Sequence, residues 1–322
     1  MSGDTAKVGD GRLRTWGDLG GRSSSRPYED PLLASVGETP LLPLARIAEG
    51  RFELLAKAEF LNPTGSVKDR AALSIVRRAL DEGALGPGRT LVDASSGNTA
   101  VAYAMLGARL GFPAELILPR NASPARVAAI LAYGARVVFT DPLEGTDGAQ
   151  REARRRAAEQ PDRYFYPDQY NNPSNPGAHY VSTGPEIWRQ SGGRISHFVA
   201  GVGTGGTISG TGRFLKEQNP SVEIVGVEPV GPLHGLEGLK HLPTARRPST
   251  YDERVVDRTI RVETEGAEEM RRRLGREEGL RVGRSAGAAV LASVEVGKAN
   301  PKAVVVTILP DSGHDDPATE EA

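Results

Sequence analysis

The stretch NPTGSVKDR (62–70) stands between an apolar run, ELLAKAEF (53–60), and a segment with helical spacing, AALSIVRRAL (71–80). A strand that leads through a loop into a helix is the repeating unit of an α/β fold with parallel strands. Because the same unit returns along the rest of the chain, this stretch predicts an α/β fold.

Strand and helix patterns keep alternating towards the C-terminus. Further strands are predicted at TLVDAS (90–95), AELILP (114–119), RVVFT (136–140), RYFYP (163–167), SHFVAG (196–201), VEIVGVE (222–228) and AVVVTIL (303–309). Helices are predicted at 100–110, 124–134, 147–159, 207–218, 264–278 and 285–297. Two consecutive runs of such units predict two α/β domains, each with a mostly parallel sheet flanked by helices.

The domain boundary is expected in YNNPSNPGAHY (170–180), which is dense in Asn and Pro and is our candidate crossover. The N-terminal α/β domain would span 29–172 and the C-terminal domain 173–322. Residues 1–28 are polar and rich in Gly and Ser, which predicts a disordered tail. The acidic segment 315–322 is expected to fray.

The composition excludes several classes of protein. The 322 residues carry a formal net charge of -1, which does not favour a nucleic-acid binder or a polybasic membrane anchor. No apolar run reaches the roughly 20 residues of a membrane helix, and the N-terminus lacks a signal-peptide core. There is no cysteine, and the five histidines are scattered, so we expect no metal site and a cytoplasmic protein.

Lys68 is the first candidate for chemistry. Ser66 and Asp69 have the spacing of a capping box, which would place Lys68 in the first helical turn. The partial positive charge there favours the neutral amine, which is the form that Schiff-base chemistry requires. The alternative is a surface lysine whose ammonium group points into water.

A second polar loop, Ser95-Ser96-Gly97-Asn98-Thr99, also lies between a strand and a helix. Its backbone N–H groups and short hydroxyls would suit a carboxylate or a phosphate at the helix N-terminus. Ordinary N-capping would need only one of these residues.

A third loop, GVGTGGT (201–207), has the context of a phosphate cradle, with Thr204 and Thr207 as hydroxyl donors. Its glycines also satisfy G-x-G-x-x-G, and Glu228 follows at the end of the next strand. That is the dinucleotide fingerprint, so an NAD-dependent oxidoreductase stays open as an alternative. A fourth segment, GRSAG (283–287), starts an apolar helix in which Ser285 is either the N-cap or a ligand contact.

Read in order, these segments resemble the cysteine synthase and cystathionine β-synthase family of fold-type II pyridoxal phosphate (PLP) enzymes. The resemblance runs from about Asp30 to Ser312. It rests on VGETPL (36–41), NPTGSVKDR (62–70), SSGNT (95–99), DQYNNPSNP (168–176), GTGGT (203–207), VEP (227–229), EEGLRVGRSAGAA (277–289) and PDSG (310–313).

The resemblance implies a fold like that of the tryptophan synthase β chain and a role for each matching residue. Lys68 matches the lysine that holds PLP covalently and later carries a proton. Asn98 matches the hydrogen-bond donor to the ring oxygen, and Ser285 faces the pyridine nitrogen. The remaining positions are the phosphate loop, Gly203, Thr204, Gly205, Gly206 and Thr207, and the substrate-carboxylate site, Ser95, Ser96, Gly97, Thr99 and Gln169.

The implied activity is cysteine synthesis, in which a sulfur nucleophile replaces the β-substituent of O-acetylserine or O-phosphoserine. The loop HGLEGLKHLPTARRP (234–248) offers Lys240, His241, Arg246 and Arg247 to an anionic donor or a sulfur-carrier protein, or is a solvated basic loop. The closest alternative is cystathionine β-synthase, acting on serine and homocysteine. The resemblance also implies a homodimer.

The chain departs from the family pattern at three positions near these motifs. Glu38 stands where the family usually has Asn, Ser95 where it has Thr, and Ala100 where it has Gly. Ser95 keeps a hydroxyl group, so we expect carboxylate binding to survive. The departures therefore bear on the identity of the substrate and leave the cofactor motifs intact.

Overall fold

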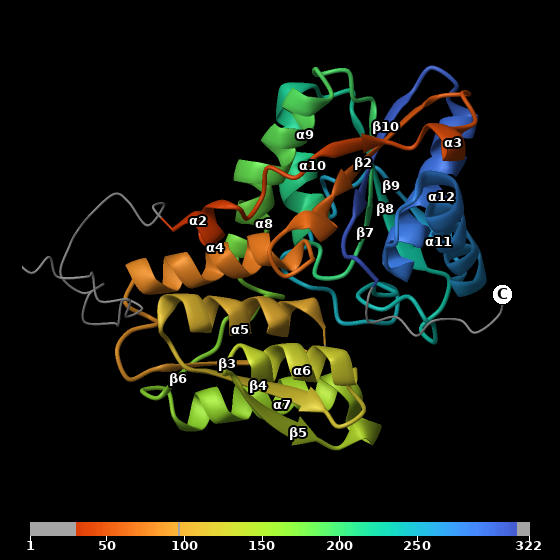
Figure 1. Ribbon diagram of the computed structural model, residues 1–322. Coiled ribbons are helices and arrows are strands. Elements are labelled where there is room, and N and C mark those ends of the chain that lie inside the picture. The colour runs from red at the N-terminus through yellow and green to blue at the C-terminus, as the bar shows by residue number, and fades with distance from the viewer. Residues whose placement is uncertain (1–29, 96, 314–322) are drawn as a thin grey trace, which may run out of the picture.

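Two sheets of mainly parallel strands, each covered by helices on both faces, organise the chain (Figure 1). The computed structural model describes residues 30–95 and 97–313. The predicted tail at 1–28 and the acidic segment 315–322 lie outside the described residues. Within the described residues, no helix is both long and apolar enough to cross a membrane.

The larger sheet has six strands, and all but its first edge strand are parallel to their neighbours. Its strands, in spatial order, are β1 (Leu41–Pro43), β2 (Glu53–Ala58), β10 (Val304–Leu309), β7 (His197–Gly201), β8 (Glu223–Pro229) and β9 (Arg258–Val262). β1 pairs antiparallel to β2. The central strand β10 is almost entirely buried, which explains its sequence VVVTIL, in which five of the six residues are apolar.

The smaller sheet has four parallel strands. In spatial order they are β5 (Arg136–Thr140), β4 (Ala114–Pro119), β3 (Thr90–Ala94) and β6 (Tyr164–Phe165). All six residues of β4 are buried. This is the pattern of an inner strand that is covered on both faces.

Helices pack on both faces of each sheet, and an apolar core lies between the helices and the sheet on each face. On the larger sheet, α3 (Ala45–Ala48), α11 (Thr264–Glu278) and α12 (Arg284–Ala299) cover one face, and α9 (Gly184–Gln190) and α10 (Gly206–Gln218) the other. On the smaller sheet, α4 (Lys68–Asp81), α5 (Asn98–Leu110) and α6 (Pro124–Ala132) share one core with the strands, and α7 (Gly145–Glu159) packs on the opposite face. The short helices are α2 (Pro31–Ala34), η2 (Glu59–Leu61), η3 (Pro142–Glu144), α8 (Ser174–Ala178) and the π-helical turn η4 (His179–Thr183).

The α/β class and the two helix-flanked sheets predicted from the sequence are confirmed. The sequence did not predict β1, β9 or the helical run α8–η4–α9. β1 has only three residues, and β9 is a half-exposed edge strand, so neither gives an apolar run. The domain boundary near residue 172 remains a prediction, and β1 and β2 hydrogen-bond in the same sheet as the C-terminal strands.

Candidate active site

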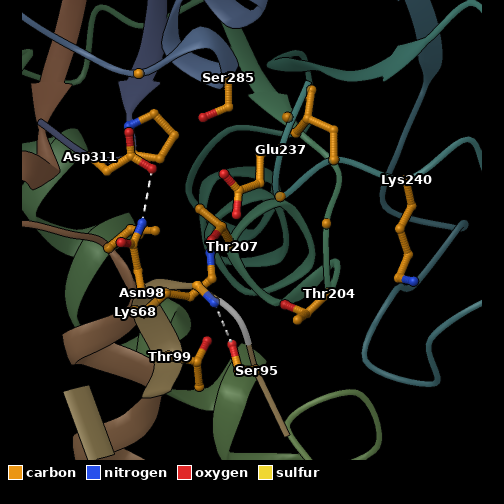
Figure 2. Close-up of a pocket in the computed structure, with 18 of the residues that line it drawn as sticks. Lys68, Ser95, Asn98, Thr99, Thr204, Thr207, Glu237, Lys240, Ser285 and Asp311 are labelled. Carbon is orange, nitrogen blue, oxygen red and sulfur yellow. Dashed lines mark hydrogen bonds between the residues drawn. The ribbon is translucent and has the colours of Figure 1, made fainter. Parts of the chain in front are cut away.

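A cavity of about 280 Å³ opens at the carboxyl ends of strands from both sheets. Residues that follow β3, β7 and β10 line it (Figure 2). In parallel α/β sheets this edge is where ligands bind, because loops and helix N-termini converge there. Residues of the polar loop 95–99, the glycine loop 201–207 and the segment 283–287, which the sequence analysis selected, therefore line the same cavity.

Lys68 is the first residue of α4 and lines the cavity. Burial lowers the pKa of its amine, and the charge of Asp311 opposes that shift. The position in the first helical turn is confirmed, but the capping box is wrong. A capping box would need the Asp69 carboxylate to accept from the backbone N–H of Ser66. Instead it accepts hydrogen bonds from the backbone N–H and the hydroxyl of Thr64, in the loop that precedes the helix.

The polar loop after β3 presents its side chains to the same cavity. Asn98 opens α5, and its amide donates a 2.9 Å hydrogen bond to Asp311 Oδ2 (Figure 2). Thr99 Oγ1 donates to Gln169 Oε1 at 2.9 Å, which joins two positions expected to bind the substrate carboxylate. Ser95 and Gly97 also line the cavity, and Ser96 lies outside the described residues.

Neighbouring atoms pack closely against the glycine loop between β7 and α10 and leave no room for side chains at two of its positions. A Cβ atom on Gly203 would lie 2.1 Å from the carbonyl oxygen of Gly238, and one on Gly206 would lie 1.9 Å from Asn175 Oδ1. Gly205 has a φ of +84°, which side chains rarely adopt. The glycines are therefore required by packing and backbone conformation, and the loop can present its N–H groups to an anion.

Two side chains that the sequence analysis did not select support the hydroxyls of this loop. Asn175 Nδ2 donates to Thr204 Oγ1 at 3.0 Å, and His179 Nε2 lies 3.2 Å from Thr207 Oγ1. Burial lowers the pKa of His179 to about 3, so the ring is neutral. The only signal in the sequence was the unusual Asn- and Pro-rich segment that contains both residues.

Ser285 is the second residue of α12 and is 7% exposed at the cavity wall. The N-cap is Gly283, so the alternative that Ser285 caps the helix is wrong. Asp311 is a further cavity residue that the sequence left without a role. Asp311 acts on two predicted site residues. Its carboxylate accepts a hydrogen bond from Asn98, and its charge raises the pKa of Lys68.

Comparison with known proteins gives the family. The model of the family "Pyridoxal-phosphate dependent enzyme" matches residues 32–311. The chain belongs to this family. A cysteine synthase of Aquifex aeolicus is 48% identical over 89% of this chain and 90% of its own, and cysteine synthase B of Escherichia coli is 43% identical over 87% and 91%.

The solved structures agree with this assignment. A cysteine synthase of Entamoeba histolytica superposes with a TM-score of 0.85 at 30% identity, covering 98% of this chain and 93% of its own. The chain is thus a fold-type II PLP enzyme, as the motifs predicted. PLP fits the residues present, because a lysine amine of lowered pKa and a glycine-threonine loop at helix α10 line one cavity.

The dinucleotide alternative is not favoured by the comparisons or by the geometry. Glu228, which would have to bind a ribose, is 3% exposed at the end of β8. Its carboxylate accepts hydrogen bonds from the N–H of Leu242 and from Arg261, both at 3.1 Å. It therefore fixes the loop after β8 and does not face a ligand.

Proposed function

We propose that this PLP enzyme is a cysteine synthase, which replaces the β-substituent of O-acetylserine or O-phosphoserine by a sulfur nucleophile to give L-cysteine. The observation that carries the proposal is the convergence of Lys68, the Ser95–Thr99 loop and the Gly203–Thr207 loop on one cavity. The cysteine synthases of Aquifex aeolicus and Escherichia coli share 48% and 43% identity with nearly the whole chain. Cystathionine β-synthase is not favoured.

The cofactor supplies an electron sink that acidifies the α-carbon of a joined amino acid. Lys68 would hold the cofactor and, once displaced by substrate, would take the α-proton and return it. The pKa of Lys68, lowered by burial, supports this role, because only the neutral amine can accept a proton. Asn98 and Ser285, which both line the cavity, would orient the ring. The loop Gly203, Thr204, Gly205, Gly206 and Thr207 would bind the phosphate.

The substrate carboxylate would bind to the loop after β3, through Ser95, Ser96, Gly97 and Thr99, and to Gln169. Support comes from the buried hydrogen bond between Thr99 and Gln169, which already fixes the two segments relative to each other. We expect carboxylate binding to draw the smaller sheet over the cavity and exclude water.

Of the four residues of the loop 234–248 offered to an anion, Lys240, His241, Arg246 and Arg247, only Lys240 lines the cavity. Its amine lies 4.9 Å from the centroid of the Tyr170 ring. His241 is hydrogen-bonded to Thr244, and Arg247 forms an ion pair with Glu253. We therefore keep O-acetylserine as the proposed donor and treat O-phosphoserine as the second candidate.

We further propose a cytoplasmic homodimer that uses sulfide or a sulfur-carrier protein as its nucleophile, with the domains divided near residue 172. Sedimentation of the purified protein tests the dimer, and a monomer at micromolar concentration would contradict it.

The test of function is cysteine formation from sulfide with three donors, O-acetylserine, O-phosphoserine and serine. We expect turnover with the first or second and little with serine. Turnover of serine with homocysteine, without cysteine formation from either activated donor, would instead establish the cystathionine β-synthase reaction.

A further inference from the structure

Asp311 lies two residues after β10, where segments that carry three of the proposed cofactor residues meet. Its backbone forms an isolated antiparallel bridge with Ser66, two residues before Lys68. Its carbonyl oxygen accepts a 3.3 Å hydrogen bond from the N–H of Gly283, the N-cap of the helix that carries Ser285. The backbone of Asp311 therefore joins the start of α4 to the start of α12 beside the cavity.

The Asp311 carboxylate is held in place on two sides. Its Oδ2 atom accepts a 2.9 Å hydrogen bond from the amide of Asn98, the first residue of α5 (Figure 2). Its Oδ1 atom lies so close to Gly283 that a Cβ atom on that glycine would come within 2.1 Å of it. A carboxylate oxygen accepts hydrogen bonds and donates none, so Asn98 must turn its Nδ2 atom towards Asp311. A negative charge thus has a defined place in the cavity wall.

This charge acts on the Lys68 amine, which lines the same cavity. Burial lowers the pKa of the Lys68 amine, and the negative charge of Asp311 raises it. His179, which also lies near Lys68, stays neutral because burial lowers its own pKa to about 3. The carboxylate of Asp311 and the burial of the amine are therefore opposing influences on the same proton.

Other charged residues near Lys68 are directed elsewhere. Within α4, the Asp69 carboxylate accepts from Thr64, and the Arg70 guanidinium is paired with two glutamates. Further charged residues line the cavity from α6, α7, α12 and the connection between β8 and β9, namely Arg126, Asp147, Arg284, Glu237 and Lys240. Of these groups, all in the described part of the chain, Asp311 is the one whose charge shifts the pKa of Lys68.

The balance matters because Lys68 must be neutral and yet basic. Burial favours the neutral amine, but an amine with a very low pKa is too weak a base to take a proton from carbon. A general base works best when its pKa lies near the operating pH. A fixed anion beside a buried amine moves its pKa back towards that range.

We propose that Asp311 is a positioning residue of the cofactor site: held by Asn98, it places a fixed negative charge beside the Lys68 amine and thereby controls when that amine carries a proton. The inference rests on the proposed role of Lys68 as the cofactor lysine. Without this charge, Lys68 would lose its proton at lower pH and would be a weaker base once substrate displaces it from the cofactor.

The test measures the proton on Lys68 in the full chain after the cofactor has been removed. Acetic anhydride acylates neutral amines and spares protonated ones, so labelling over a series of pH values, followed by peptide mass analysis, gives the midpoint for Lys68. The exposed Lys298 serves as the internal reference. D311N keeps the size of the side chain and removes its charge. We expect the Lys68 midpoint to fall by about one pH unit or more in D311N, since a nearby opposite charge shifts a pKa by about 1–3 units.

A second readout uses the PLP-loaded protein. In D311N the acidic limb of the pH profile of kcat should move to lower pH in step with the labelling midpoint, while the plateau falls because the base is weaker. Return of the cofactor absorbance when PLP is added back shows that the fold survives removal of the cofactor. D311S also removes the charge and carries the same expectation, so the test stands if D311N misfolds.

The matched control is D81N, which removes an exposed carboxylate from the opposite end of the same helix and should leave the Lys68 midpoint unchanged. An unchanged midpoint in D311N and D311S, or an equal fall in D81N, would overturn the proposal. Failure of the proposed role of Lys68 looks different, because borohydride reduction would then join the cofactor to another lysine, whatever the midpoint of Lys68.

Discussion

His179 shows how a single buried residue links the cofactor loop to the stability of the fold. It is 2% exposed and lies between the hydroxyls of Thr183, at 2.9 Å, and Thr207, at 3.2 Å. Burial lowers the pKa of His179 to about 3, so the folded protein keeps this ring neutral. In the unfolded chain the ring takes up a proton near pH 6.5. The neutral ring can accept a hydrogen bond at one nitrogen and donate one at the other, which suits a chain of two hydroxyls.

This difference predicts a pH-dependent loss of stability. Between pH 3 and pH 6.5 the unfolded state binds one more proton at His179 than the folded state, so stability rises with pH in that window. When the pH falls from 7 to 5, the titration of His179 should lower the free energy of unfolding by about 2 kcal/mol. H179Q, which cannot titrate, should therefore lose about 2 kcal/mol less than the original protein over this range, as measured by urea unfolding at both pH values.

The control is H241Q, because His241 is hydrogen-bonded to Thr244 at the surface. We expect H241Q to follow the pH dependence of the original protein. Parallel pH dependences for H179Q and the original protein would show that His179 is protonated in the folded state.

At this scale the sequence revealed the residues that carry chemistry but not those that support them. Lys68 and the glycine loop stand in contiguous motifs with a strand before and a helix after, which local patterns can show. Asn175, His179 and Asp311 act across 29, 28 and 213 positions of sequence on Thr204, Thr207 and Asn98. Such contacts exist only once the sheets have assembled, so no local spacing predicts them.

At the scale of elements, helix α4 is anchored by a buried cluster of charges. The Arg70 guanidinium contacts Glu59 Oε2 at 2.7 Å and Glu186 Oε1 at 2.6 Å. It also donates to Thr39 and Ser182. Because Arg70 follows Lys68 by two residues, the cluster joins the start of α4 to η2, directly after β2, and to α9. It thereby fixes where Lys68 enters the cavity.

Removal of Arg70 should therefore destabilise the fold. R70L leaves the carboxylates of Glu59 and Glu186 buried with a partner missing, which costs about 3–5 kcal/mol. R78L, on the exposed side of the same helix, removes an ion pair whose side chains are 54% and 55% exposed and should cost less than about 1 kcal/mol. Urea unfolding measures both, and equal losses would contradict the role given to the cluster.

The glycine loop gives a second prediction at the element scale. In G206A the new methyl group would meet Asn175 Oδ1, so Asn175 must move and release Thr204. Thr204, once released, would no longer be held in place to bind the cofactor phosphate. We expect PLP affinity to fall about tenfold, since a hydrogen bond to a charged group such as this phosphate contributes about 1.5–3 kcal/mol. G177A, in the neighbouring helix α8, meets no atom within 4 Å and is the control. Equal PLP affinities in equilibrium dialysis would contradict this account of the loop.

At the scale of the whole molecule, strand–helix alternation was enough to predict two helix-flanked sheets, but not how the chain is distributed between them. β2 pairs with β10 across about 250 residues, because an inner position next to β10 buries both of its faces. Nothing local to 53–58 distinguishes a partner so distant. The arrangement matters for function, since it brings the α4 start, the loop after β3 and the loop after β7 to one cavity.

Lys68 is the residue that we expect to hold the cofactor. Borohydride reduction of the PLP-loaded protein, followed by proteolysis and peptide mass analysis, tests it most directly, because reduction makes a lysine–cofactor bond permanent. We predict the added pyridoxyl phosphate mass on the peptide that contains Lys68 and its absence in K68A. The mass on another lysine, such as Lys57 or Lys240, or on no peptide of a protein shown to bind PLP, would contradict the account.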